Sequence, residues 1–410
     1  MRLLLGIVFF IVTTPLMAKE VIRFGSLIIH ERHEQAFQQL IQSFEKEHPN
    51  YQVQMRRLSG SSFDELSSKL DNYGAELDVI SWHAGDRLSV LAKSGFIKPI
   101  DGLWHDLGFN QSYPSSIRRS VTVDGKVFGV PYLYYPLGFY YNKATFARLG
   151  LSAPVDWTSF IDVLKIIQAD GVYPIAFGGK ESWPAAAWFD YLTLRLFGED
   201  FYKQVVNGEV NFESSTEIQQ VFTLWQALVE SKFFLPTHEE ISSSRSLHLV
   251  AREHAAMTLI GSFSLSHIPE KVQGKLGYFP FPQIIEDVPT VEIAPTTVMS
   301  LTTSAGDNEA AELFLRYMTK PEHQKLLANS MASCSPNIKA MQKDPALVIK
   351  GAEQLNNASS TTQFFDREAP KGFAQSAQQV FIDFIDHGDV KAALHQLEVH
   401  RQQQFIHLAP

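Results

Sequence analysis

The sequence predicts an α/β fold built around parallel or mixed sheets. Three strand–helix pairs follow one another between residues 21 and 93. A second unit of helices and short apolar strands begins near residue 132, behind a cluster of aromatic residues. The chain has 410 residues, 45% of them apolar, so it is long enough to bury two cores. This order of elements is typical of sheets that helices cover on both faces.

The first unit is predicted from hydrophobic periodicity. Phe37, Leu40, Ile41 and Phe44 recur at the spacing of one helix face, and Pro49 ends the helix. The next residues alternate between apolar and polar, as in a half-buried strand. The expected strands are 21–25, 51–55 and 77–82, and the expected helices are 31–48, 62–72 and 86–93. Ligands bind at the carboxyl ends of such strands, which points to the loops 26–32, 58–62 and 82–86.

The second unit contains more helix. Asn142 is expected to cap a short helix that ends at Gly150, because asparagine accepts hydrogen bonds from a first turn and glycine adopts the left-handed conformation. Gly171 ends a helix that begins at Trp157 in the same way. The other expected helices are 183–197, 216–231, 244–253, 308–319, 322–329 and most of 369–400; the expected strands are 173–177 and 255–259, with an extended crossing over 277–282.

The charge balance argues against nucleic acid as a partner. Lys and Arg total 35 and Asp and Glu total 44, which gives a formal net charge of −9 with no basic run. Phosphate contacts need clustered cations. The single cysteine, Cys334, excludes an intramolecular disulfide and a cysteine zinc site. A lone cysteine is most often a small buried apolar side chain.

The first 18 residues have the composition of a secretory signal. Arg2 supplies a positive start, an apolar stretch follows, and Ala18 precedes the charged pair Lys19-Glu20. The apolar stretch is about 15 residues, shorter than the roughly 20 that span a bilayer, and an uncleaved anchor is the alternative. We expect cleavage after Ala18 and a location in the periplasm. No later stretch is apolar enough to cross a membrane.

Seven segments form a recognisable series. The strongest is 123–150, VDGKVFGVPYLYYPLGFYYNKATFARLG, in which Asp-Gly-Lys, Gly-Val-Pro, Tyr-Asn-Lys and Leu-Gly follow in order. The others are 37–49 (FQQLIQSFEKEHP), 77–101 (LDVISWHAGDRLSVLAKSGFIKPID), 154–160 (PVDWTSF), 253–261 (EHAAMTLIG), the double-proline crossing 277–282, and 309–328 (EAAELFLRYMTKPEHQKLLA). Together they resemble the family-1 extracellular solute-binding proteins of ABC importers, which include maltose- and glycerol-phosphate-binding proteins.

This resemblance implies a two-lobe periplasmic binding protein of type II, with hinge-linked α/β lobes and mixed sheets. The N-terminal lobe would contain 19–131 and 284–333, and the C-terminal lobe would contain 137–278 and 336–410. The chain would cross between the lobes at 132–136, 279–283 and 334–335. No cofactor is implied.

The implied ligand is a sugar, which needs flat rings for its C–H faces and paired polar groups for its hydroxyls. On the first lobe the candidates lie at strand ends: His30, Glu31, Arg32, Ser59, Ser61, Trp82, His83 and Asp86. The alternative role of Asp86 and Ser61 is to cap the helices that follow them.

On the second lobe the candidates are Tyr135, Trp183, Phe263, Thr296 with its neighbour Thr297, and Arg367. Trp183 precedes a proline in a polar loop, which suits stacking better than the helical position of Trp188, expected in the core. Phe263 stands where the family often has Trp. The alternative for Arg367 is a surface ion pair with Asp366.

No motif favours an enzyme. The chain lacks G-x-G-x-x-G, G-x-x-x-x-G-K-[ST], G-x-S-x-G and H-E-x-x-H. The run His30-Glu31-Arg32-His33-Glu34 has the wrong spacing for a helical zinc site, so no metal is expected. A glycosidase needs only two suitably spaced carboxylates, and a secreted carbohydrate-active enzyme is therefore a third hypothesis.

The sequence thus predicts a monomeric binding protein that captures a mono- or oligosaccharide and delivers it to an ABC permease. The shortage of Lys and Arg in the expected cleft loops, apart from Arg32 and Arg367, favours a neutral sugar. The alternative with the same fold is a sensory protein that presents its ligand to a membrane histidine kinase or chemoreceptor.

Overall fold

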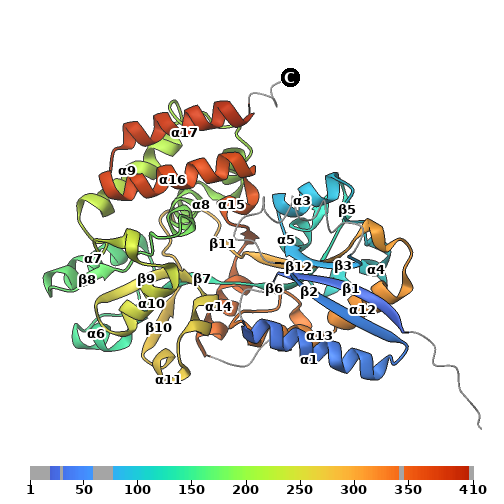
Figure 1. Cartoon of the computed structure of the whole chain (residues 1–410). Coiled ribbons are helices and arrows are strands. Elements are labelled where there is room, and N and C mark those ends of the chain that lie inside the picture. The colour runs from blue at the N-terminus through green and yellow to red at the C-terminus, as the bar shows by residue number, and fades with distance from the viewer. Residues whose placement is uncertain (1–18, 28–30, 59–76, 341–345, 406–410) are drawn as a thin grey trace, which may run out of the picture.

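A computed structural model describes residues 19–27, 31–58, 77–340 and 346–405 (Figure 1). Its larger sheet has the strand order β2 (Tyr51–Leu58), β1 (Glu20–Leu27), β3 (Val79–His83), β12 (Thr296–Leu301) and β6 (Val130–Tyr134). β1 pairs in parallel with β2 and β3, whereas β12 is antiparallel to both β3 and β6. The sheet is therefore mixed, as the alternating sequence predicted.

A second sheet has the order β10 (Leu276–Phe279), β7 (Leu137–Asn142), β9 (Ala255–Gly261) and β8 (Tyr173–Ile175). β9 is antiparallel to β7 and parallel to β8, so this sheet is mixed too. Two strand pairs complete the β structure: β4 (Thr122–Val123) with β5 (Lys126–Val127), and β11 (Val291–Ile293) with β13 (Ser360–Thr362).

Helices surround each sheet, and the molecule divides into two lobes that Figure 1 shows side by side. The helices around the larger sheet are α1 (Glu31–Glu47), α3 (Asp86–Lys93), α4 (Asp101–Asp106), α5 (Ser115–Arg119), α12 (Glu309–Met318) and α13 (Pro321–Ser330). Those of the other lobe are α6 (Lys143–Arg148), α7 (Trp157–Ala169), α8 (Trp183–Val206), α9 (Thr216–Glu230), α10 (Ser243–Ala251), α11 (Glu270–Gln273), α14 (Ala346–Asn357), α15 (Phe365–Glu368), α16 (Lys371–His387) and α17 (Val390–Phe405).

The local signals in the sequence are confirmed where the structure describes them. The Asn142 side chain accepts hydrogen bonds from the backbone of Ala144 and Thr145, and so caps α6. Gly150 ends that helix with a left-handed φ of 66°. α8 runs nine residues beyond the expected 197, past a kink where Gly198 has a φ of 79°. The signal segment 1–18 and the expected helix 62–72 lie outside the described residues.

Two apolar clusters form the cores. The second is rich in rings: Phe189 stacks on Phe381 with centroids 4.5 Å apart, and Trp188 meets Phe234 edge-on at 5.3 Å. Trp188 is 1% exposed, which confirms its expected place in the core. Cys334 is buried as well, and burial raises the pKa of its thiol to about 12. It is a small core side chain and not a reactive thiolate.

The chain passes directly from one sheet to the other at Tyr135 and Pro136, between β6 and β7. A second passage lies at Ala294 and Pro295, because β11 still packs in the second core and β12 enters the larger sheet at residue 296. The sequence placed this passage earlier, at 279–283. A third passage lies between Cys334 and α14. Cys334 forms a bridge with Tyr134 of β6 in the larger sheet, whereas α14 packs against β10 of the second sheet.

A buried polar network anchors these passages to the second lobe. Arg195 of α8 pairs with Glu292 of β11 at 2.5 Å, and both side chains are 1% exposed. Glu292 also accepts from Tyr191 and from Gln354 of α14. Gln354 also donates to the carbonyl of Leu137, the first residue of β7, and the Tyr191 hydroxyl oxygen lies 3.1 Å from the same carbonyl. One network therefore joins the residues next to all three passages.

Arg195→Met is expected to destabilise the protein by about 3–5 kcal/mol, because it leaves the Glu292 carboxylate buried without its cation. Equilibrium chemical denaturation measures this free energy. Arg148→Met is the matched control: Arg148 pairs with Asp170 at 2.7 Å but is half exposed to solvent, so its loss should cost far less stability. Equal losses in the two variants would contradict the anchoring role of the network.

Candidate functional site

Three strand ends of the larger sheet meet at one edge. β6 runs parallel to β3, and β12 lies between them in the opposite direction. The end of β3, the start of β12 and the residue after β6 therefore lie together. These positions are occupied by His83, Thr297 and Tyr135. This is the carboxyl edge of the parallel strands, where α/β sheets bind their ligands.

Strand alternation separates His83 from its neighbour Trp82. His83 and Thr297 are direct partners across β3 and β12, and Trp82 is paired with Val298. Successive side chains point to opposite faces, so Trp82 lies on the face opposite His83. Trp82 is 1% exposed, and its Nε1 donates to the Arg87 carbonyl at 3.2 Å. The structure thus places Trp82 in the core of the first lobe.

Aromatic rings form a continuous arc beside this edge. Tyr135 meets Phe263 edge-on with centroids 5.5 Å apart, Phe263 lies 5.7 Å from Trp183, and Trp183 lies 5.4 Å from Phe364. The guanidinium of Arg367 stands 5.9 Å from the Phe364 ring. Phe263 belongs to the 3₁₀ segment Ser262–His267, Trp183 begins α8, and Phe364 precedes α15. Three of the rings therefore belong to the second lobe, and Tyr135 lies at the passage that follows β6 of the first.

Polar atoms without partners accompany the rings. His83 Nδ1, the Tyr135 hydroxyl, Thr297 Oγ1 and Arg367 Nη1 are buried, and within the described part of the chain they have no hydrogen-bond partner apart from the interaction between the Tyr135 and Thr297 hydroxyls. Each buried unsatisfied group costs about 1–3 kcal/mol, and such groups are uncommon in folded proteins. Four of them at one place indicate that a polar ligand binds there. We call these four residues with Trp183, Phe263 and Phe364 the interlobe cluster.

Burial and neighbouring charges set the protonation states of the cluster. Burial lowers the pKa of His83 well below its usual value, and the charges of Arg367 and Arg87 lower it further. His83 is therefore neutral at neutral pH. Burial raises the pKa of Tyr135 to about 12, although Arg367 and the Thr297 hydroxyl oppose the rise. Burial also lowers the pKa of Arg367 to about 10, which leaves it charged at neutral pH.

Carboxylates surround the two guanidiniums. Arg87 of α3 pairs with Asp366 of α15 at 2.7 Å and so ties the first lobe to the second. Burial raises the pKa of Asp86, and the charges of Lys93 and Arg87 oppose that rise. Burial raises the pKa of Glu368 as well, and the nearby Asp86 charge adds to it. Carboxylates and cations are thus interspersed beside the cluster, and the Arg87 charge is already balanced by Asp366.

Buried hydrogen bonds hold the segment that carries Phe364 and Arg367. Asp190 accepts from the Phe365 backbone and from the Tyr202 hydroxyl, each at 3.1 Å. The Gln363 side chain accepts from the Thr296 backbone at 2.8 Å, which links the segment to the start of β12. The segment is thus fixed both to α8 and to a passage between the lobes.

The structure brings five of the predicted residues into the interlobe cluster: His83, Tyr135, Trp183, Phe263 and Arg367. Asp86 lies beside it, in the first turn of α3. The cap position of α3 is Gly85 and no side chain caps the helix, so the capping alternative for Asp86 is wrong. The ion-pair alternative for Asp366 and Arg367 is met at Asp366, which pairs with Arg87, whereas Arg367 Nη1 is buried in the cluster.

Other predicted residues lie elsewhere. Thr296 is buried and its hydroxyl donates to the Ala294 carbonyl at 2.8 Å, so Thr297 carries the unpartnered hydroxyl. Glu31 and Arg32 are exposed at the start of α1. Arg32 lines a separate hollow of about 280 Å³ with Ser266, Ile268, Glu270, Gln273, Asn329, Ser330 and Ala332. His30, Ser59 and Ser61 lie outside the described residues.

Sequence reasoning did not select Phe364, and it did not separate Thr297 from Thr296. Phe364 stands directly before Phe365, which is buried in the second core, and no periodicity distinguishes the two rings. Thr297 is adjacent to Thr296, and only the register of β12 against β3 decides which hydroxyl faces His83.

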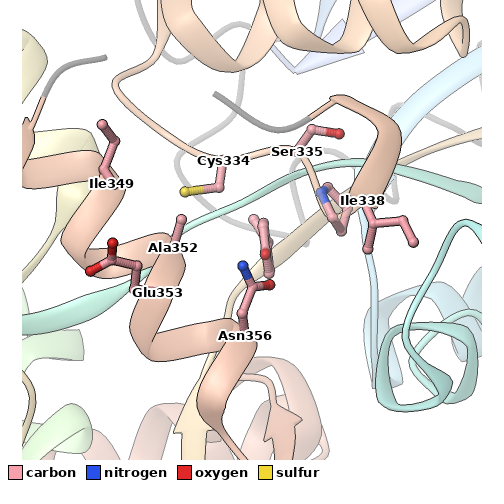
Figure 2. Close-up of a pocket in the computed structure, with 9 residues that line it drawn as sticks. Cys334, Ser335, Ile338, Ile349, Ala352, Glu353 and Asn356 are labelled. Atoms are coloured by element: carbon pink, nitrogen blue, oxygen red, sulfur yellow. The ribbon is translucent and has the colours of Figure 1, made fainter. Parts of the chain in front are cut away.

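A second hollow lies between α14 and the chain around Cys334. Figure 2 shows Cys334, Ser335 and Ile338 on one side and Ile349, Ala352, Glu353 and Asn356 of α14 on the other. Its volume is about 110 Å³. Among the residues that the structure describes, no three His, Cys, Asp or Glu side chains are grouped to hold a metal ion. In the same ranges, no helix has the length and apolarity needed to cross a membrane.

Two lobes, with a polar and aromatic site between them, define a solute-binding protein. The family model of bacterial extracellular solute-binding proteins matches residues 30–325, and the chain belongs to this family. Its members are substrate-binding proteins that act outside the cytoplasm. This confirms the fold and the family predicted from the sequence.

Relatives carry the same description. The chain is 25% identical to an uncharacterised ABC transporter extracellular-binding protein of Pyrococcus horikoshii, over 88% of this chain and 82% of the relative. It is 23% identical to a multiple sugar-binding protein of Streptococcus mutans, over 68% and 67% of the two chains.

Solved structures share the fold. The solute receptor AcbH, described as having an exclusive preference for β-D-galactopyranose, superposes with a TM-score of 0.82. The two chains are 23% identical, over 94% of this chain and 100% of AcbH. RafE of Streptococcus pneumoniae superposes with a TM-score of 0.79 at 18% identity, covering 94% and 98% of the two chains.

The depressed pKa of His83 predicts a pH dependence of stability. The unfolded chain takes up a proton near pH 6.5, whereas folded His83 does so only at lower pH, so this residue makes unfolding easier as the pH falls below 6.5. His83→Phe should remove that loss, which is at most about 1.4 kcal/mol per pH unit. Denaturation of both proteins at pH 7.5 and 5.5 measures it. A variant of the exposed His105, His105→Gln, should retain the wild-type slope.

Proposed function

We propose that this protein is the extracellular receptor of a carbohydrate ABC importer and that it binds a neutral sugar in the interlobe cluster. The observation that carries the proposal is the set of four unpartnered buried polar atoms beside a continuous arc of rings. Membership of the solute-binding family and the names of the relatives support the transport role. Nothing in the described residues favours the sensory alternative.

The chemistry of a sugar matches this arrangement. Its C–H faces pack on the rings of Trp183 and Phe263, and its hydroxyls satisfy His83, Tyr135, Thr297 and Arg367. Because the polar groups are unpaired without a ligand, an analogue that lacks a contacted hydroxyl leaves one of them unsatisfied and binds much more weakly. Contacts from both lobes to one ligand favour the closed arrangement of the lobes.

The charges favour a neutral sugar over a uronate or a sugar phosphate. Arg87 is already paired with Asp366, and the charges of Asp366 and Arg87 act on the pKa of Arg367 in opposite directions. No cation of the cluster other than Arg367 is therefore left to balance an anionic ligand. Arg367 instead donates from Nη1 to an uncharged oxygen.

Three further features belong to the proposal. The first 18 residues direct export and are removed, so the mature protein acts in the periplasm as a monomer. The protein docks on a membrane permease once its ligand is enclosed. It has no catalytic role, and incubation with oligosaccharides should leave them unchanged when the mixture is separated by chromatography.

A thermal-shift screen tests the ligand class. Residues 19–410 are incubated with neutral mono- and oligosaccharides, uronic acids, sugar phosphates, polyols and amino acids. A ligand at roughly 1,000 times its Kd adds roughly 4 kcal/mol of stability, which raises the Tm measurably. We expect a neutral sugar to do so, and Trp183→Ala to remove the shift by loss of the stacking ring.

The matched control is Trp157→Ala. Trp157 is a half-buried tryptophan that packs on Phe160 and Phe281, outside the interlobe cluster. This variant should keep the sugar-induced shift. A response confined to amino acids would overturn the carbohydrate proposal, and a preference for uronates or phosphates would overturn the assignment of charge.

A further inference from the structure

The register of β12 against β3 places two polar side chains in unusually close opposition. The Ala84 amide donates to the Thr296 carbonyl at 3.0 Å, so Ala84 and Thr296 form a hydrogen-bonded pair. Hydrogen-bonded and non-hydrogen-bonded pairs alternate along an antiparallel ladder. His83 and Thr297, the next pair, are therefore a non-hydrogen-bonded pair, in which opposing side chains come closest.

Both side chains of this pair lack a partner for one polar atom. His83 Nδ1 and Thr297 Oγ1 are buried, and in the described ranges neither makes a hydrogen bond outside the interlobe cluster, in which the Thr297 hydroxyl interacts with that of Tyr135. They stand on the same face of the sheet, with Cβ atoms about 5 Å apart as in any directly opposed pair.

Two neighbouring hydroxyls on a sugar ring offer one hydrogen-bonding group to each member of this pair. Neutral His83 offers one donor or acceptor at Nδ1, and the Thr297 hydroxyl offers both. Each hydroxyl of a vicinal diol can also donate and accept. Arg367 and Tyr135, which lie around the pair, carry the other unpartnered atoms and would reach different oxygens of the same sugar.

We propose that His83 and Thr297 form a diol-reading pair: each binds one of two adjacent ring hydroxyls of the sugar and so determines which sugars the protein accepts. This inference rests on the proposed function. It adds that the specificity of the site resides in a cross-strand pair whose two members are 214 positions apart in the sequence.

The test uses Thr297→Val, which keeps the shape of the side chain and removes its hydroxyl. The matched control is Ser300→Ala on the same strand. The Ser300 hydroxyl is also buried without a partner in the described residues, but it lies three residues along and faces Gly129 on the other side of the sheet. Both variants should retain the wild-type Tm without ligand to within a few degrees, because each removes a single hydroxyl and keeps the shape of the side chain.

Binding of D-galactose, D-glucose, D-mannose and D-xylose is measured by calorimetry, followed by the singly deoxygenated forms of whichever sugar wild-type protein binds most tightly. Thr297→Val should weaken that sugar roughly ten- to a hundredfold, and Ser300→Ala should leave it within about twofold. One deoxy sugar should bind wild-type protein and Thr297→Val with the same weak affinity, because it lacks the hydroxyl that Thr297 binds. Wild-type protein and His83→Phe should likewise bind a second deoxy sugar with equal affinity, one that lacks the hydroxyl on the adjacent carbon.

The outcomes separate the two proposals. Each variant should identify one ring position at which removal of the hydroxyl weakens wild-type binding but not the variant's. If the positions found with Thr297→Val and His83→Phe are not adjacent on the ring, the diol-reading pair is wrong while sugar binding stands. Equal weakening of binding by Thr297→Val and Ser300→Ala would also exclude the pair. If wild-type protein binds none of the four monosaccharides and responds to no carbohydrate in the thermal-shift screen, the proposed function itself is wrong. Recovery of binding by His83→Gln, which restores a polar atom, would support a hydrogen-bonding role over a purely structural one.

Discussion

The antiparallel insertion of β12 between β3 and β6 is the constraint on which the rest of the structure depends. Without it, the larger sheet would end at β3, and the first passage to the second lobe would have no fixed starting point. With it, the end of β3, the start of β12 and the end of β6 are held at one edge by backbone hydrogen bonds. The polar residues at this edge are positioned by main-chain geometry, which side-chain substitutions elsewhere do not disturb.

The second lobe faces this edge through residues 363–367, which two buried hydrogen bonds hold in place. Asp190 holds the backbone of Phe365, and Gln363 binds the backbone of Thr296. The Arg195–Glu292 network anchors the residues next to the passages in the same lobe. A receptor that closes on its ligand needs rigid bodies on either side of a short flexible connection. Buried charge pairs cost desolvation energy, and their value here is to fix position.

The electrostatics of the site follow from the same placement. Arg367 is kept from Asp366 because Arg87, from the other lobe, takes that carboxylate. The freed guanidinium lowers the pKa of His83, whose burial already disfavours a charge. The site is thus rich in hydrogen-bonding groups and poor in net charge, a combination that suits hydroxyl groups better than carboxylates or phosphates.

The sequence by itself determined the local structure. Periodicity gave the helices and strands, Asn142 and Gly150 marked the ends of α6, and ordered segments along the chain identified the family. It also placed His83, Tyr135, Trp183, Phe263 and Arg367 among the candidates. It could not separate Trp82 from His83 or Thr296 from Thr297, because β3 is buried over four successive residues and β12 over its whole length. Alternation then leaves no amphipathic pattern to read.

Only the tertiary structure decided which side chains meet. Arg87 and Asp366 are 279 residues apart, and their pairing releases Arg367. His83 and Thr297 become neighbours because β12 enters the sheet after the chain has built most of the second lobe. Contacts of this kind depend on strand register and on packing between distant elements, and neither is encoded in the local pattern of polar and apolar residues.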